Sequence, residues 1–312
     1  MWGKQPGGAT ILARVLSLLP ALGLAVMSGC RGPLPFASPA PSPQYVLVVE
    51  PADLLPGEIA LGTLWVVGGP LPTAASLEAC GRRQPMVAVG NRLAAFLAVP
   101  ASQAPGEVVV TALLQGAGVP ERATTTIRVQ PRRFPASRIR ASPSQLEARS
   151  EEKLREDQEK VRRAKSSSAP RPLWEGEFIL PLDAPVSTPY GFIRYINDRE
   201  VGRHAGVDLV APAGTPVVAT NAGRVVFADR LHAAGLTVIV DHGLSLFSSY
   251  CHLSRIAVGA GDTVRKGQVV GWVGNTGFST GPHLHWSVTV GLNSVDPASL
   301  TGPRPWLGSL PR

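Results

Sequence analysis

At 312 residues, the chain is long enough for two domains that each bury a core of their own. Its 33 glycines and 30 prolines, with only 6% aromatic residues, favour short strands and turns and argue against a bundle of long helices. The formal net charge of +8 suits binding to an anionic polymer such as a cell-wall glycan. Because basic and aromatic residues are not interleaved, nothing indicates a nucleic-acid-binding surface.

The first 30 residues have the pattern of an export signal. Lys4 and Arg14 precede an apolar run over residues 15–26, which is short for a membrane span, and small residues then lead to Cys30. This pattern resembles a bacterial lipoprotein signal, which implies that residues 1–29 are removed and that Cys30 is lipidated. We therefore expect an exported, membrane-anchored lipoprotein that faces the periplasm or cell envelope. An ordinary secretory signal or an uncleaved anchor is the alternative.

The segment after Cys30 predicts a tether and then a small β domain. Residues 30–44 are rich in proline, which favours an extended tether. Residues 45–134 show short apolar stretches separated by glycine and proline, which predicts a small β-sandwich of immunoglobulin type. The expected strands cover residues 45–49, 59–67, 93–99, 108–114 and 124–129. This domain has no histidine, so we expect a structural or positioning role.

Residues 135–173 predict a charged helical linker. Within them, residues 146–164 are highly charged, with Glu and Lys at helical spacing, and we expect one solvated helix. A stretch of serine, alanine and proline over residues 166–172 ends this helix. Because the helix has no apolar stripe, we interpret it as a connection between domains rather than as a partner-binding helix.

Residues 174–300 predict a second β domain, followed by a C-terminal tail over residues 301–312. Nothing in this domain offers a crossover helix, so we expect antiparallel pairing. The main expected strands cover residues 215–219, 223–228, 236–240, 246–252, 269–273 and 284–290. All six histidines of the chain lie in this domain, between His204 and His285. The fold class is therefore mainly β, and its chemistry is expected in the C-terminal domain.

Four residues of this domain are candidates for a metal site. His283 and His285 are two residues apart on an expected strand, so both imidazoles should point to one face. His204 and Asp208 would be about 13 Å apart on a straight strand, so they can meet only if the backbone bends at Gly206. Two histidines and one carboxylate would leave the fourth position of a tetrahedral zinc site open, as catalysis requires.

Two further histidines are not needed as metal ligands and are candidates for proton transfer. His252 and His283 can transfer protons or stabilise an oxyanion near neutral pH. Tyr250 should face the same way as His252 on a strand, and Cys251 should face away as a small buried thiol that is not paired with Cys80. Four turn residues are interpreted as structural or solvated: His232, His242, Asp241 and Asp296.

Three motifs together resemble those of the lysostaphin/LytM-type zinc metallopeptidases. They are His-Ala-Gly-Val-Asp at 204–208, Tyr-Cys-His-Leu at 250–253 and His-Leu-His at 283–285. The resemblance implies one Zn²⁺ ion held by His204, Asp208 and His285. It implies that His252 and His283 are the catalytic histidines, which orient or deprotonate the water and stabilise the tetrahedral intermediate. The implied activity is that of a peptidoglycan endopeptidase, and a D,D-endopeptidase is the favoured specificity.

Two other functions remain open. A non-catalytic wall-binding activator of a partner hydrolase is one, although the complete set of five residues argues against it. A zinc protease for exposed protein substrates is the other. The expected partners are peptidoglycan and a membrane reached through the lipid anchor, without nucleic acid, and the oligomeric state is open. Residues 195–202 lead into His204 and are expected to rim the cleft, which the first domain could occlude.

Overall fold

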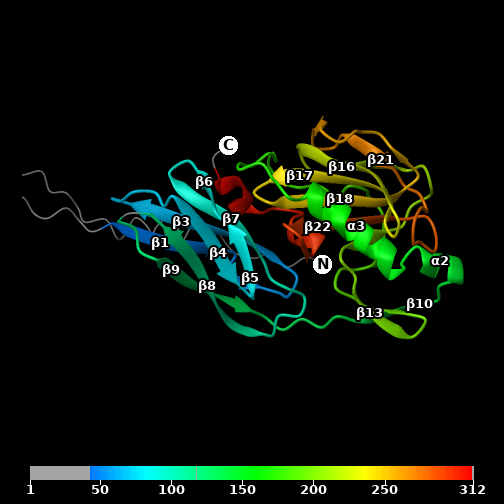
Figure 1. The fold of residues 1–312 in the computed structure, drawn as a ribbon, viewed down its shortest axis with the longest axis horizontal. Coiled ribbons are helices and arrows are strands. Elements are labelled where there is room, and N and C mark those ends of the chain that lie inside the picture. The colour runs from blue at the N-terminus through cyan, green and yellow to red at the C-terminus, as the bar shows by residue number, and fades with distance from the viewer. Residues whose placement is uncertain (1–42, 117, 311–312) are drawn as a thin grey trace, which may run out of the picture. The chain divides into compact units, whose positions relative to one another are not determined.

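The computed structural model describes residues 43–116 and 118–310, and within them the protein is mainly β (Figure 1). The export signal, Cys30 and nearly all of the tether lie outside the described residues. No helix in the described part of the chain is long and apolar enough to cross a membrane.

The N-terminal part consists of two sheets around a common apolar core. The first sheet has the spatial order β1 (Gln44–Glu50), β3 (Ile59–Val67), β7 (Arg92–Ala98) and β6 (Val87–Val89). The second has the order β2 (Asp53–Leu54), β9 (Arg122–Val129), β8 (Gly106–Gln115), β4 (Ala74–Ala79) and β5 (Arg82–Pro85). Side chains from both sheets, such as Leu64 and Val110, are buried in one cluster. The five expected strands are present, and the immunoglobulin-like topology stays a prediction.

Strand β7 is buried on both faces, which explains its almost unbroken apolar sequence. Alternate residues of β7 join the core of the N-terminal sheets and a second core shared with the C-terminal domain. In the second core, the ring of Phe96 lies 5.6 Å from that of Trp174 and 6.4 Å from that of Trp306. Trp306 belongs to the 3₁₀ helix η2 (Pro305–Ser309), in which Trp306 is partly buried and Leu307 is buried. Part of the expected C-terminal tail is therefore packed into the core.

The C-terminal domain is built on an antiparallel sheet. Its strands have the spatial order β11 (Val186–Thr188), β14 (Val207–Leu209), β22 (Leu284–Val290), β18 (Leu246–Leu253), β17 (Gly235–Gly243), β16 (Gly223–Leu231) and β20 (Thr263–Val264). Strand β23 (Asn293–Val295) pairs with β22, and the 3₁₀ helix η1 (Pro297–Ser299) follows it. A smaller sheet contains β15 (Pro216–Val218), β21 (Val269–Trp272) and β19 (Arg255–Ile256). The pairing is antiparallel throughout both sheets, as predicted.

The linker differs from the single solvated helix that we predicted. Its elements are β10 (Ala136–Ile139), α2 (Pro143–Glu147) and α3 (Glu151–Ala164). Strand β10 pairs in parallel with β12 (Ile193–Ile196), which forms a hairpin with β13 (Arg199–Arg203). The helical segment is divided because two serines, Ser142 and Ser150, each cap the start of a new helix.

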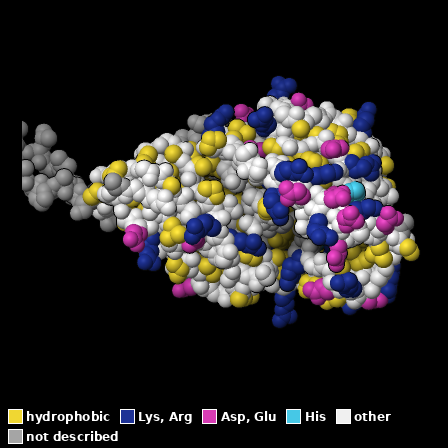
Figure 2. Space-filling view, in the orientation of Figure 1, with side chains coloured by type: hydrophobic (Ala, Val, Ile, Leu, Met, Phe, Trp, Pro, Cys, Tyr) yellow, Lys and Arg dark blue, Asp and Glu magenta, His cyan; other side chains and the backbone are white. Residues whose placement is uncertain are grey.

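Helix α3 is attached to the C-terminal domain through a buried carboxylate. Asp157 is buried and accepts hydrogen bonds from the backbone N–H groups of His232 (2.8 Å) and Ala233 (2.9 Å), in the turn between β16 and β17. The imidazole of His232 also lies 2.9 Å from the Glu156 carboxylate. Figure 2 shows acidic and basic side chains interspersed over the surface where Figure 1 places α3. The outer face of the helix is thus charged, while Asp157 holds its inner face to the domain.

Candidate metal centre

His204, Asp208 and His285 meet where β14 lies beside β22. One potential ligand atom from each lies within 4.8 Å of the others. The Nε2 atom of His204 is 3.0 Å from Oδ1 of Asp208 and 2.9 Å from Nδ1 of His285, which is itself 2.8 Å from the same Oδ1. Two imidazole nitrogens and one carboxylate oxygen form the donor set of many catalytic zinc sites. These residues therefore fit a divalent ion such as Zn²⁺.

Gly206 allows the chain to reach this arrangement, for a reason that differs from the one we predicted. Its φ is not in the left-handed region, so conformational freedom is not what requires glycine. A Cβ atom at this position would lie 2.3 Å from the carbonyl oxygen of Trp286 on β22. The glycine therefore lets β14 approach β22 closely, and Asp208 then lies directly opposite His285 in the strand register.

Hydrogen bonds orient the ligand atoms. His204 donates from Nδ1 to the carbonyl oxygen of Pro189 (2.9 Å), which orients Nε2 toward Asp208 and His285. Burial alone raises the pKa of the Asp208 carboxyl, but hydrogen bonds to His204 and His285 outweigh it and hold that pKa well below its usual range. Burial lowers the pKa of His285. A charged carboxylate and a neutral imidazole are the forms that bind metals.

Arg194 is a part of the site that we did not predict. It lies on β12, and its Nη2 atom is 3.0 Å from Oδ2 of Asp208, so Oδ1 is the oxygen left facing the histidines. The signal in the sequence is a lone arginine within the otherwise apolar run Phe-Ile-Arg-Tyr-Ile at 192–196. A largely buried guanidinium on a strand requires a carboxylate partner, and the sequence alone does not indicate which one.

His252 and His283 lie beside the three candidate ligands. Their ring centroids are 4.8 Å apart, and Nε2 of His283 is 3.8 Å from Oδ1 of Asp208. In each ring Nδ1 donates to a backbone carbonyl, that of Thr276 for His252 (2.7 Å) and that of Gly281 for His283 (2.8 Å). Both rings are therefore fixed with Nε2 free to accept a proton.

Strand alternation fails at the end of β18. Tyr250 pairs with Trp286, and Cys251 pairs with His285, so Cys251 is on the face that carries the candidate ligands. His252 has a φ of +60°, and a register shift interrupts the neighbouring pairing of β17 with β18. This left-handed residue turns the His252 ring to the same face as His285, with 6.0 Å between their ring centroids.

The prediction that Tyr250 shares a face with His252 is therefore wrong. The hydroxyl of Tyr250 accepts a hydrogen bond from the Thr220 backbone N–H (2.8 Å) and lies 2.9 Å from the Ser248 hydroxyl. Both contacts are in the apolar core on the other side of the sheet. Tyr250 thus supports the fold and does not offer a hydroxyl to the site.

Burial sets the protonation of the groups around the site. It lowers the pKa of His252 to about 3, and the neighbouring His285 and His283 add to this shift, so the ring is neutral at neutral pH. Burial also raises the pKa of the Cys251 thiol to about 11, so this cysteine is an inert buried thiol. Cys80 and Cys251 are both free, as predicted.

The remaining polar residues hold elements together. His242 is fully buried between the carbonyl oxygen of Ala222 (2.7 Å) and the hydroxyl of Ser248 (2.8 Å). Asp296 forms an ion pair with Arg132 at 2.6 Å. These contacts agree with the structural interpretation of both residues.

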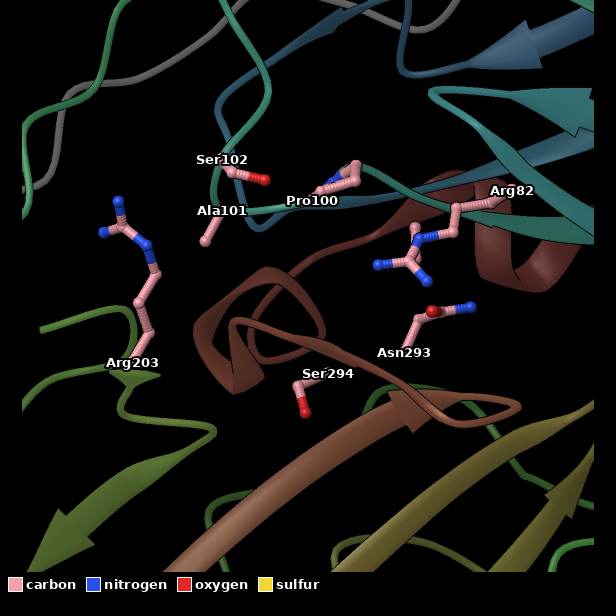
Figure 3. A pocket seen from close by; sticks show the side chains of 8 residues that line it. Arg82, Pro100, Ala101, Ser102, Arg203, Asn293 and Ser294 are labelled. Carbon is pink, nitrogen blue, oxygen red and sulfur yellow. The ribbon is translucent and has the colours of Figure 1, made fainter. Parts of the chain in front are cut away.

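A cavity outside this cluster has a different chemistry. It has a volume of about 270 Å³, and its lining includes Arg82, Ser102, Arg203 and Asn293 (Figure 3). The residues that line it include no histidine, cysteine or carboxylate. This cavity therefore lacks metal ligands and proton-transfer groups. The histidine cluster has both, so it is the candidate reaction site.

Comparisons with known proteins identify the family. A model of the family described as "Peptidase family M23" matches residues 202–297, which include all five candidate residues. A solved structure from Pseudomonas aeruginosa, assigned to peptidase M23, is 31% identical, covers 80% of this chain and 95% of its own, and has a TM-score of 0.56. The chain belongs to peptidase family M23. The family resemblance predicted from the three motifs is confirmed.

Each of two curated relatives matches less than half of this chain. The DD-carboxypeptidase/endopeptidase Mpg of Neisseria meningitidis is 38% identical over 122 residues, 39% of this chain and 28% of the relative. The peptidoglycan DD-endopeptidase ShyA of Vibrio cholerae is 42% identical over 92 residues, 30% of this chain and 21% of the relative. The chain therefore matches less than a third of the length of either protein.

Proposed function

We propose that this M23 peptidase is a zinc-dependent endopeptidase that hydrolyses peptide cross-links of peptidoglycan in the cell envelope. The observation that carries the proposal is the convergence of His204, Asp208 and His285 on one point, with His252 and His283 beside it. The names of its relatives Mpg and ShyA support a wall peptide as substrate and a D,D bond as the target.

The zinc ion would be held by Nε2 of His204, Oδ1 of Asp208 and Nδ1 of His285. When bound there, it supplies Lewis acidity that polarises a peptide carbonyl and lowers the pKa of water. Asp208 contributes a negative charge because its hydrogen bonds keep it ionised. Arg194 holds the second carboxylate oxygen and so fixes the orientation of the first.

His252 and His283 provide the proton transfer. Each is fixed by a hydrogen bond from Nδ1 to a backbone carbonyl, so each presents Nε2 as the acceptor. An imidazole in this form can accept a proton from water and return it to the amine that leaves when the peptide bond breaks. Between these two transfers, the protonated ring can stabilise negative charge on the carbonyl oxygen.

Digestion of purified sacculi tests this function directly. We expect the zinc-loaded protein to release peptides whose masses correspond to cleavage of the cross-link, and we expect His204→Ala and His285→Ala to lose this activity with their fold retained. Full activity in both variants would overturn the proposal. Failure of the wild type to cleave sacculi, combined with stimulation of a partner amidase, would indicate an activator instead. Preference for Gly-rich peptides over cross-linked muropeptides would indicate a protease of another specificity.

We propose further that the chain is exported and anchored through lipid on Cys30. The support is the charged N-terminus, the short apolar run and the small residues before Cys30 in the sequence. In cells fed a labelled fatty acid, the wild type should carry the label and sediment with membranes. Cys30→Ala should lose both properties. An unlabelled wild type that remains soluble after cell lysis would contradict the anchor.

A further inference from the structure

The cavity shown in Figure 3 lies at the junction of the two β domains. Arg82 on β5 and Ser102 in the β7–β8 loop line it from the N-terminal domain, and Arg203, Asn293 and Ser294 line it from the C-terminal domain. Arg82, Ser102 and Arg203 are exposed, so a ligand can reach the cavity from solvent. Its volume of about 270 Å³ is close to the lower end of the range for small-molecule sites. One amino-acid or sugar unit of a larger ligand would therefore fit.

The β4–β5 hairpin places Arg82 in this cavity. Cys80 and Gly81 have φ values of +53° and +68°, which is the conformation of a tight two-residue turn between antiparallel strands. Arg82 is the first residue after the turn and pairs with Ala79. Arg83 follows it and should point to the opposite face of β5, where it forms an ion pair with Glu78. Arg82 is thus presented to the cavity without a carboxylate partner from its own hairpin.

Arg203 is held in the cavity by uncharged groups. Its Nη1 atom donates a hydrogen bond to the carbonyl oxygen of Gly191 (3.2 Å), and its guanidinium lies 5.1 Å from the centroid of the Phe134 ring. Such contacts orient a guanidinium without neutralising its charge. Among the described residues, no ion pair involves Arg82 or Arg203.

The chemistry of the lining favours an anion. Two arginines line the cavity, and none of its lining residues is an aspartate or glutamate, so its charge is positive. The hydroxyl of Ser102 and the side-chain amide of Asn293 add uncharged hydrogen-bond donors. Guanidinium binds carboxylate through charge-assisted hydrogen bonds of well-defined geometry. The peptides of a bacterial wall carry free carboxylate groups in addition to the bond that is cut.

The position of the cavity connects it with the candidate metal centre. Arg203 directly precedes His204 in the chain, so a ligand bound to Arg203 is held beside the strand end that carries a candidate metal ligand. His204 itself does not line the cavity. Binding here would therefore leave the histidine cluster accessible while it restricts where a large substrate can lie on the protein.

We propose that this cavity is a second binding site for peptidoglycan, which takes a carboxylate-bearing unit of the wall peptide away from the bond that is cut. Arg82 and Arg203 supply its positive charge, one from each domain. The inference rests on the proposed function, because it takes peptidoglycan as the ligand. It gives the N-terminal domain a role in recognition of the wall. Arg82 lies outside the segment that matches the family model, so the site would be a property of the two-domain chain.

The test measures binding of uncross-linked muropeptide monomers to the full chain loaded with zinc, because monomers contain no cross-link to cleave. Fluorescence anisotropy compares labelled monomers with the same monomers after their carboxylates are converted to amides. We expect wild type to bind the carboxylate form at least about ten-fold more tightly, the fold-change typical of a hydrogen bond to a charged group. Arg82→Gln and Arg203→Gln should lose most of this preference, and Arg82→Lys should retain part of it.

Arg83→Gln is the matched control. It removes the same charge from the neighbouring position of β5, but Arg83 does not line the cavity, so its binding should equal that of wild type. A melting temperature near that of wild type should show that each variant is folded. The NMR signal of the Asn293 side-chain amide should shift when the carboxylate monomer binds to wild type and should not shift in Arg82→Gln.

Three results would overturn the second site. Wild type could bind both monomers equally, Arg82→Gln could keep the preference, or Arg83→Gln could lose as much binding as Arg82→Gln, which would indicate general charge attraction. Inorganic phosphate that binds more tightly than the monomer would also overturn it, because the cavity would then be a phosphate site. Charge-dependent binding that requires Arg82, without cleavage of sacculi by wild type, supports the site and contradicts the endopeptidase. Cleavage of sacculi without such binding does the reverse.

Discussion

The Nε2 atom of His204 lies 2.9 Å from the Nδ1 atom of His285, although the two residues are 81 positions apart in the chain. Each ring presents a different nitrogen, because Nδ1 of His204 is occupied by the carbonyl oxygen of Pro189. Asp208 Oδ1 is within 3.0 Å of both nitrogens. Two imidazole nitrogens and one carboxylate oxygen held this close together form a site that a cation would stabilise by binding among them.

Zinc should therefore stabilise the folded protein. Ligand that binds only the folded state raises the melting temperature as its free concentration increases. We expect the Tm of wild type to rise with added zinc and to fall with a chelator, and we expect His285→Ala to respond to neither. His232→Ala is the control, since this histidine contacts Glu156 on the surface of the linker. A zinc-dependent Tm in His285→Ala would show that the metal binds elsewhere.

Substitution of Gly206 should disrupt the candidate metal site by changing the position of the β14 backbone. In Gly206→Ala, the new methyl group meets the Trp286 carbonyl oxygen, so β14 must move away from β22. We expect a loss of about 1–3 kcal/mol in the free energy of unfolding and weaker zinc binding. Urea unfolding and zinc titration measure the two effects. Gly308→Ala, where no atom lies within 4 Å of the added methyl group, should change neither.

Asp157 should contribute to stability through the attachment of α3. In Asp157→Ala, the backbone N–H groups of His232 and Ala233 lose their acceptor, which costs about 1–3 kcal/mol for buried groups of this kind. Urea unfolding should show this loss, while Gln158→Ala on the exposed side of the same helix stays near wild type. An unchanged stability in Asp157→Ala would mean that α3 is not held by this carboxylate in solution.

His242 should make the protein less stable in acid. Burial lowers its pKa to about 4, whereas an unfolded histidine titrates near 6.5. Between these values the unfolded state binds a proton that the folded state does not, so stability falls as the pH drops from about 6.5 to 4. The contribution is on the order of 3 kcal/mol when the pH is below both values. Stability measured by urea unfolding at several pH values should depend less on pH in His242→Gln.

An equal pH dependence in wild type and His242→Gln would contradict this assignment. His252 also has a lowered pKa, but it is present in both proteins, so the difference between them isolates His242. The comparison should be made without zinc, because metal binding to the nearby cluster has its own pH dependence.

Local sequence patterns predicted the long strands and the family, since apolar periodicity and the three motifs are local features. They did not predict interactions that depend on tertiary contacts. The face of His252 was assigned by ideal alternation, and the left-handed backbone at that residue reverses it. The linker helix was assigned as solvated because its residues are charged, yet Asp157 is buried by partners in a distant turn. Arg194 was overlooked because its partner Asp208 is 14 positions away on another strand.

The register of β14 on β22 determines whether a metal site exists at all. Asp208 lies opposite His285 only in the observed pairing, and a shift by one residue would place Val207 or Leu209 there. A cation that requires both groups would bind only the correctly paired chain. Metal binding would then stabilise only the chains in which β14 and β22 pair in the observed register. Chains with a shifted register would not bind the ion and would not gain this stability.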